Sequence, residues 1–251
     1  KGFLPTWDYD TLHKLEVALL LLGRVTSISE PLIRTLEPED WSESWKAYFE
    51  PQRIGQHIVI APTWRDYETR PGDTVVRIDP GMAFGTGLHA TTRLCLESLE
   101  KLALTDLTVL DVGTGSGILA IAAALRGARA VDALDIDEVS VQVALDNVAL
   151  NGVGDRVSVA RGTLHGSDTT ADMPVHTTSG YDLVFANILA EVIIALAHAL
   201  ADALAAGGTL VASGIIGDKG DMVTDALTAA GLVVAERREE NDWLALIAHK
   251  P

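Results

Sequence analysis

The chain has 251 residues, of which 48% are hydrophobic and 22% are charged. This balance is typical of a folded soluble protein and excludes a disordered chain. Nineteen basic against thirty-five acidic side chains leave a formal net charge of −16, which would repel a nucleic-acid backbone and attract a basic protein partner. The longest apolar run, residues 118–125, is too short for a membrane helix.

Cysteine usage and the first residues bear on the compartment. The only cysteine is Cys95, which excludes an internal disulfide and a cysteine-based zinc site and suits a reducing cytosol. We therefore expect a cytoplasmic protein, and we predict no metal site. The chain opens with KGFLP, without an initiator methionine or a signal-peptide pattern, so we expect it to start inside a longer gene product.

The first part of the chain is short of core-forming material. Residues 1–37 offer one apolar helix candidate, at about 11–22, and one strand candidate, at about 29–36. We expect this to be too little to bury a core, as if half of a small α/β domain were missing. Residues 38–64 are interpreted as a linker helix and an interdomain segment. In this helix Trp41, Trp45 and Phe49 recur every four residues, which places an aromatic stripe on one face for packing against a neighbouring domain.

Residues 65–251 are interpreted as one α/β domain. Strands alternate with helices, which predicts a doubly wound, mostly parallel seven-stranded sheet covered on both faces, with an antiparallel hairpin at its end. The stretch 164–180 is rich in Ser, Thr, Asp and Gly and is expected to be a mobile surface loop. Predicted strands are 57–61, 73–79, 108–112, 130–135, 156–160, 181–186, 209–213, 232–236 and 243–249, the last two separated by a charged turn at 237–242. Predicted helices are 89–102, 118–126, 138–151, 190–205 and 217–230.

A glycine-rich turn follows the strand 108–112. Gly113 and Gly115 allow a tight turn and let the backbone approach a ligand closely. Asp135 ends the next strand, twenty-two residues after Gly113, and its carboxylate can accept hydrogen bonds from the two hydroxyls of an adenosine ribose. The third glycine comes one residue too early for the nicotinamide fingerprint, since position 118 is Ile. This spacing is commoner in enzymes that use S-adenosylmethionine.

A second glycine-rich loop, residues 79–92, lies ahead of this turn. Its apolar residues Met82 and Phe84 suggest a lid over a ligand, and we predict that Phe84 and Gly85 contact the cofactor. Thr92 stands in the first turn of the following helix, where hydroxyls and free amides can meet a carboxylate. A helix cap alone is the alternative.

Two further polar residues are candidates. Asn187 follows the strand 181–186, where a side chain points into the ligand crevice of such a sheet. Its carbonyl oxygen can accept a hydrogen bond from an amine and so aim the nitrogen lone pair, although capping of the next helix is an equal alternative. His89 could accept a proton, but a histidine at a helix start is the preferred interpretation, and no general base is identified.

Together these segments resemble one family closely: PrmA, the methyltransferase of large-subunit ribosomal protein eleven. The resemblance covers about residues 36–251 and is carried by residues 79–92, 109–120, 134–137 and 187–190. It implies a class I methyltransferase that moves a methyl group from S-adenosylmethionine to lysine side chains or the N-terminal amine of a basic ribosomal protein, with no direct contact to nucleic acid or membrane. It also implies that residues 1–37 are the remnant of a substrate-recognition domain. The cofactor-binding residues implied are Thr92, Gly113, Asp135 and Asn187.

Three alternatives stay open. A methyltransferase of the release-factor glutamine type shares the glycine turn, but its signature Asn-Pro-Pro-Tyr is missing because Ile188 and Leu189 replace both prolines. A nicotinamide dehydrogenase shares the fold but needs the longer glycine spacing. A non-catalytic module that binds an adenosine cofactor is the third, and the presence of Asp135 and Asn187 argues weakly against it.

Overall fold

The computed structural model describes residues 49–79, 89–165, 175–176 and 178–251. The chain divides into two compact units, Lys1–Phe49 and Glu50–Pro251, and every described residue except Phe49 belongs to the second. Several predicted features lie outside the described residues. They are the N-terminal segment 1–37, Trp41 and Trp45, the loop residues Phe84 and Gly85, and most of the stretch 164–180.

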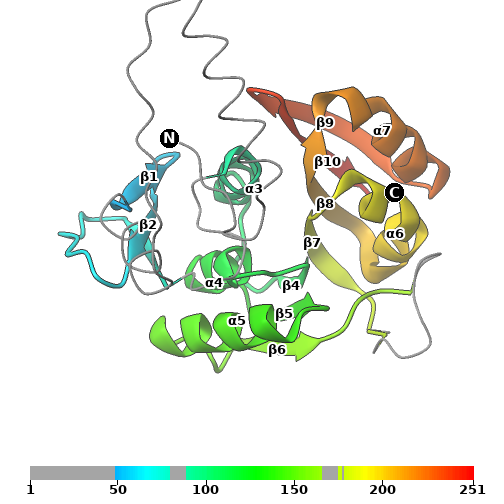
Figure 1. Cartoon of the computed structure of the whole chain (residues 1–251). Coiled ribbons are helices and arrows are strands. Elements are labelled where there is room, and N and C mark those ends of the chain that lie inside the picture. Colours follow the sequence, from blue (N-terminus) through cyan, green and yellow to red (C-terminus); the bar gives the residue numbers. More distant parts are fainter. Residues whose placement is uncertain (1–48, 80–88, 166–174, 177) are drawn as a thin grey trace, which may run out of the picture. The chain divides into compact units, whose positions relative to one another are not determined.

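A seven-stranded sheet forms the centre of the second unit (Figure 1). Its order is β6-β5-β4-β7-β8-β10-β9, and all neighbouring pairs are parallel except those of β10, which runs antiparallel to both β8 and β9. This confirms the predicted mostly parallel sheet with a terminal hairpin. The strands are β4 (Thr108–Val112), β5 (Ala130–Asp135), β6 (Val157–Arg161), β7 (Tyr181–Asn187), β8 (Leu204–Ile216), β9 (Val233–Glu240) and β10 (Trp243–His249).

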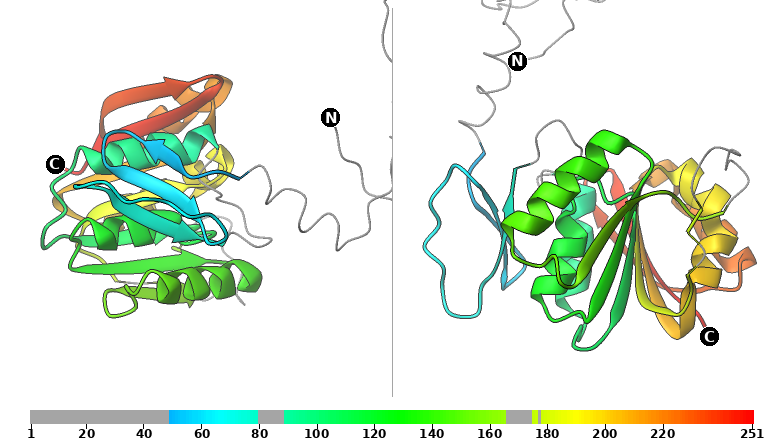
Figure 2. Two further views of the ribbon diagram at one scale, coloured as in Figure 1. Left: turned by 90° about the vertical axis from the view of Figure 1, so that its left-hand side faces the viewer. Right: turned by 90° about the horizontal axis from the view of Figure 1, so that it is seen from below.

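Helices cover both faces of this sheet (Figures 1 and 2). One hydrophobic core joins α3, α4 and α5 to Val109 of β4, and a second joins α6 and α7 to Leu110 and Val112 of the same strand. Alternate residues of a strand point to opposite faces, so a sheet buried on both sides needs a nearly continuous apolar strand. The helices are α3 (Ala90–Glu100), α4 (Ile118–Leu125), α5 (Glu138–Leu150), α6 (Ala190–Ala203) and α7 (Gly220–Ala229), with a 3-10 turn η2 (Gly217–Lys219) before α7.

The described helices include none with the length and apolar character needed to cross a membrane.

A smaller sheet packs on the α3–α4 side. It has the order β1 (Gln52–Ile54), β2 (Ile58–Pro62) and β3 (Thr74–Ile78), with β1 antiparallel and β3 parallel to β2. β2 is buried along its whole length. The sequence had not indicated β1, and the structure places residues 50–64 in the second unit rather than apart from it.

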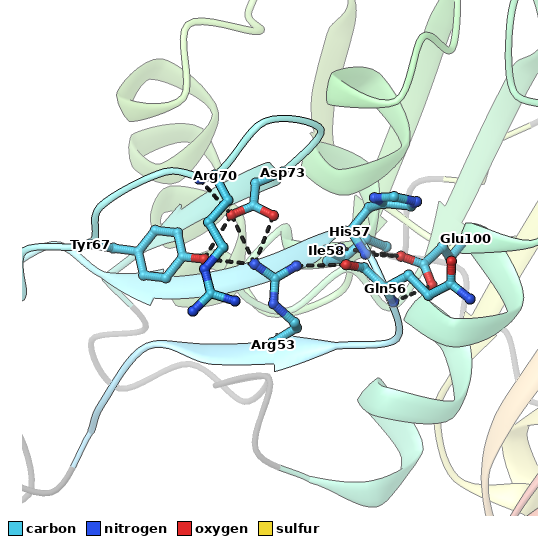
Figure 3. A network of polar contacts seen from close by, with 8 residues as sticks. All are labelled: Arg53, Gln56, His57, Ile58, Tyr67, Arg70, Asp73 and Glu100. Atoms are coloured by element: carbon cyan, nitrogen blue, oxygen red, sulfur yellow. Dashed lines mark hydrogen bonds and ion pairs between the residues drawn. The ribbon is translucent and has the colours of Figure 1, made fainter.

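Two carboxylates hold this small sheet in place (Figure 3). Glu100, the last residue of α3, accepts hydrogen bonds from the backbone N–H groups of residues 56, 57 and 58 at 2.8, 2.6 and 3.2 Å. Asp73 accepts from Arg53 at 2.7 Å and from the Tyr67 hydroxyl at 2.7 Å. Burial would raise the pKa of Asp73, but the hydrogen bonds from Tyr67, the Arg70 N–H and Arg53 lower it to about 2.

The terminal hairpin differs from the prediction. β9 continues to Glu240, so the turn is only Asn241-Asp242, with Asn241 at φ 55°, and the expected charged turn 237–242 was wrong. The charged residues belong to an edge strand, where polar side chains are compatible with pairing and discourage further strand addition. Glu240 makes a two-pronged ion pair with Arg93 of α3, with Arg93 Nε lying 3.0 and 3.1 Å from the two carboxylate oxygens.

Candidate active site

The glycine turn between β4 and α4 is confined by its neighbours. Gly113 has φ 76°, in the left-handed region that favours glycine. A Cβ added to Gly113 would lie 2.2 Å from Cγ2 of Ile188, the residue that follows β7. A Cβ on Gly117, which has φ 82°, would lie 3.3 Å from Cβ of Ala144 on α5. The turn therefore touches the end of β7 on one side and α5 on the other.

Asp135 lies across the same turn. Its Oδ2 accepts a 2.9 Å hydrogen bond from the Gly115 N–H, and its Oδ1 accepts a 3.0 Å hydrogen bond from the Asp137 N–H. The residue is partly exposed. Because an ionised carboxylate has about four acceptor sites, these two bonds leave capacity for the hydroxyls of a ligand. The structure thus brings together Asp135 and the glycine turn, as the sequence predicted.

Asn187 and Thr92 meet at the carboxyl end of β7. Asn187 Nδ2 lies 3.4 Å from the Thr92 hydroxyl, which is fully buried on α3. The other amide atom, Asn187 Oδ1, is buried and has no hydrogen-bond partner among the described residues. A buried acceptor without a donor costs about 1–3 kcal/mol, and such a group calls for an explanation such as a bound ligand or water.

The helix-capping alternatives do not describe these two residues. The N-cap of α3 is His89, whose Nδ1 accepts from the Thr91 N–H at 3.4 Å and lies 2.9 Å from the Thr91 hydroxyl. The N-cap of α6 is Leu189, so Asn187 lies outside that helix. His89 therefore occupies the helix-start position expected for it, and its ring also packs edge-on against Trp243 with 4.7 Å between centroids.

Asp111 is a buried acidic residue beside the glycine turn that the sequence analysis did not single out. It is fully buried on β4, two residues before Gly113. Its Oδ2 accepts a 2.7 Å hydrogen bond from the Thr114 hydroxyl, and its Oδ1 has no partner within the described part of the chain. Burial raises the pKa of Asp111 to about 7, although the hydrogen bonds from Thr114 and the Ala120 N–H oppose this rise. The signal available in the sequence was a single acidic residue inside an apolar strand.

Four predicted site residues besides Asn187 are described: Thr92, Gly113, Gly115 and Asp135. They come from α3, the glycine turn and β5, and they gather at the carboxyl edge of the sheet. This is where β4 pairs with both β5 and β7 and the strand order reverses. Ligands of open α/β sheets bind in this crevice. The predicted contacts of Phe84 and Gly85 with a cofactor stay predictions, since both residues are outside the described ranges.

Known proteins are similar to this chain in sequence and in fold. A family model described as ribosomal protein L11 methyltransferase (PrmA) matches residues 10–251. The ribosomal protein L11 methyltransferase of Pelotomaculum thermopropionicum is 48% identical over 99% of this chain and 78% of its own length, and that of Chloroflexus aurantiacus is 44% identical over 96% and 78%.

A solved structure, the ribosomal protein L11 methylase of Lactobacillus delbrueckii subsp. bulgaricus, is 34% identical. The match covers 81% of this chain and all of the Lactobacillus chain, with a TM-score of 0.69. The chain therefore belongs to the ribosomal protein L11 methyltransferase family.

Proposed function

We propose that this protein transfers methyl groups from S-adenosylmethionine to amines of ribosomal protein L11, namely lysine side chains or the N-terminal amine. Membership of the L11 methyltransferase family supports the substrate and the cofactor. The observation that carries the role of the site is the buried Asn187 Oδ1, which has no hydrogen-bond partner among the described residues. It lies at the sheet edge where the glycine turn and Asp135 also lie.

The described residues fit the cofactor. We propose that Asp135 binds the ribose hydroxyls of the cofactor. At Gly113 and Gly115 the backbone of the turn would approach the cofactor closely, and Thr92 and Asn187 would complete the pocket. The positive φ of Gly113 and the closeness of Ile188 leave no room for a side chain there, so this position of the turn requires glycine. When bound, S-adenosylmethionine supplies a methyl group on a sulfonium sulfur that is already activated toward nucleophiles.

The protein's task is then to align the amine and to exclude water. A free lysine amine has a pKa near 10.4 and is mostly protonated at neutral pH. Burial beside Thr92 and Asn187 would lower the pKa of an incoming amine, because desolvation disfavours the charged form. Asn187 Oδ1 would accept one amine N–H and so fix the direction of the nitrogen lone pair, which makes Asn187 the proposed catalytic residue.

The charge of the chain is consistent with a basic protein substrate. A formal net charge of −16 would speed the approach of such a partner and oppose direct binding to ribosomal RNA. We propose the cytoplasm as the compartment. We also propose that residues 1–37 take part in substrate recognition, that 38–64 contain the interdomain segment, and that 65–251 form the catalytic domain, on which β1 and β2 pack.

Methyl transfer to purified L11 tests this function directly. The protein is incubated with S-adenosylmethionine carrying a labelled methyl group and with the separated proteins of the large ribosomal subunit, and peptide mass spectrometry then locates the label. We expect label on amine nitrogens of L11. Replacement of Asn187 by Ala should lower kcat by roughly 100-fold, the scale expected for the loss of one positioned hydrogen-bonding amide in an active site.

The matched control is Asn151→Ala, which removes the same amide from a site on α5 that contacts only β3 and its own helix. This variant should keep kcat near that of the unmodified chain. Label on a glutamine amide, or on no ribosomal protein at all, would contradict the proposal. An Asn187→Ala variant with full kcat would remove Asn187 from the chemistry while leaving the activity itself in place.

A further inference from the structure

Asn147 of α5 and Asn151, the C-cap residue of this helix, pair with the backbone at the end of β3. Asn151 and Asn147 are one helical turn apart, so their side chains lie on the same face. The Oδ1 of Asn151 accepts from the Arg77 N–H at 2.8 Å and its Nδ2 donates to the Arg77 carbonyl at 2.7 Å. Asn147 does the same at Asp79, with distances of 2.9 and 3.2 Å. Together they bond to the β3 edge as a neighbouring strand would.

The two asparagines differ in the acceptor of their third side-chain hydrogen bond. Asn151 Nδ2 donates to the Asn147 carbonyl within α5, at 2.8 Å. Asn147 Nδ2 instead donates to the carbonyl of Ser116, at 2.9 Å. Ser116 belongs to the glycine turn and is fully buried, and Asn147 is only 1% exposed. One amide group therefore connects the glycine turn to the end of β3.

The same helix is attached to the site at its other end. The Asp137 side chain caps α5 by accepting from the N–H groups of Val139 and Ser140, and the Asp137 N–H donates to Asp135 Oδ1 at 3.0 Å. Asp135 in turn accepts from the Gly115 N–H. The contacts form a closed circuit: glycine turn, Asp135, α5, Asn147 and back to the glycine turn. Because interiors are close-packed, loss of one member shifts the others.

We propose that Asn147 is a positioning residue for the cofactor, which holds the glycine turn and the end of β3 in the arrangement that binds S-adenosylmethionine. The inference rests on the proposed location of the cofactor at this turn. Asn147 contacts no reacting group. It acts through Ser116 and Asp79, and Asn151 has the same relation to β3 without the contact to the turn.

The pair Asn147→Ala and Asn151→Ala forms the experiment. Each substitution removes one amide that makes three side-chain hydrogen bonds within the described chain, two of them to the backbone of Arg77 in β3 or of Asp79 just after it. Urea unfolding should report a loss of stability in both. Titration calorimetry with S-adenosylmethionine should show about tenfold weaker binding, a change of about 1.4 kcal/mol, for Asn147→Ala alone. Its KM for the cofactor should rise in proportion, with kcat and the KM for L11 nearly unchanged.

Three outcomes are distinguishable. Equal cofactor affinities in the two variants would overturn the role of Asn147. Absence of binding by the unmodified chain would overturn the proposed function itself. Should Asn147→Ala not fold, Asn147→Asp fills the same volume and keeps the acceptor for the Asp79 N–H, and in its ionised form it has no donor for the carbonyls of Ser116 and Asp79. Its affinity is therefore measured above pH 8, where the ionised form is favoured. The same weakened binding is expected for it, and affinity equal to that of Asn151→Ala would also refute the inference.

Discussion

The Gly115 N–H donates a 2.9 Å hydrogen bond to Oδ2 of Asp135, and this contact joins the glycine turn to the end of the neighbouring strand. The other carboxylate oxygen accepts from the Asp137 N–H, at the start of α5. Asp135 thus binds the backbone of both the glycine turn and the start of α5, independently of any ligand. A substitution there changes both the shape of the turn and the acceptor offered to a ribose.

Replacing Asp135 by Ala should weaken the binding of S-adenosylmethionine by about 1.5–3 kcal/mol, the usual worth of hydrogen bonds to a charged group. Calorimetric titration measures the change. Asp132→Asn is the control, since Asp132 lies on the same strand and accepts a hydrogen bond from the Tyr181 hydroxyl rather than from the turn. Unaltered affinity in the Asp135→Ala variant would exclude Asp135 from the cofactor site.

Gly113→Ala should lower the free energy of unfolding by more than backbone strain alone can explain. Its new Cβ would lie 2.2 Å from Ile188 Cγ2, next to Asn187, whereas a Cβ on Gly152 at a similar φ of 65° meets nothing within 4 Å. Gly152→Ala therefore carries only the conformational cost, about 1–2 kcal/mol. Urea unfolding should show a larger loss for Gly113→Ala, together with weakened cofactor binding.

Removal of the obstructing methyl group provides a second check on Gly113. In the double variant Gly113→Ala with Ile188→Ala, the Cγ2 atom that the new Cβ would meet is absent. Part of the lost stability and affinity should return, as a non-additive interaction between residues in contact. Simple addition of the two single effects would show that the Gly113–Ile188 contact is not what limits this position.

The bounds of several strands could be predicted to the residue, because the signals that set them lie close together in the sequence. The strands 108–112, 130–135 and 243–249 were predicted with the bounds observed, because each is a short apolar run between turn-forming or charged residues. β1 was missed since three residues carry no periodicity. The turn 237–242 was wrong because charged side chains on an edge strand resemble a loop in sequence.

The site was predictable only in part. Asp135 and Asn187 stand at strand ends, a position whose meaning follows from the topology of a parallel sheet. The partners of Asn147 cannot be found this way, because Asp79 and Ser116 are 68 and 31 positions away from it in the chain. Asp111 was overlooked because its significance depends on complete burial, which emerges only when α3 and α4 cover β4.

The contact of Glu100 with the turn between β1 and β2 predicts a pH-dependent contribution to stability. Burial alone would raise the pKa of Glu100, but three backbone N–H groups lower it below its usual value. A lowered pKa in the folded state means that the stabilisation is complete above about pH 4.3, the ordinary value for Glu. It is lost as the pH falls through the folded-state pKa.

Glu100→Gln should therefore lower the unfolding free energy at pH 7 by about 1–2 kcal/mol, and the difference from the unmodified chain should shrink between pH 5 and pH 3. Urea titrations across this range supply the measurement. Glu97→Gln, on the same helix, removes a carboxylate without this backbone contact and serves as the control. A difference for Glu100→Gln that stays constant down to pH 3 would mean that the carboxylate charge is not the stabilising element.

Asp111 predicts the opposite pH dependence, between pH 4 and pH 7. Its folded-state pKa of about 7 lies above the usual value because of burial, so in this range the folded chain keeps a proton that the unfolded chain releases. Stability must then fall as the pH rises, by up to about 1.4 kcal/mol per pH unit for one group. Asp111→Asn keeps an acceptor for the Thr114 hydroxyl and cannot ionise.

The unfolding free energy of Asp111→Asn minus that of the unmodified chain should thus increase from pH 5 to pH 7 and become constant near pH 8. Taking this difference cancels the other titrating groups, provided that both chains are measured without S-adenosylmethionine. A bound sulfonium or ammonium cation would favour the ionised carboxylate and lower its pKa, so saturating cofactor should reduce the slope. Parallel stability curves for the two chains would show that Asp111 is ionised throughout, and that a donor reaches its Oδ1 in solution.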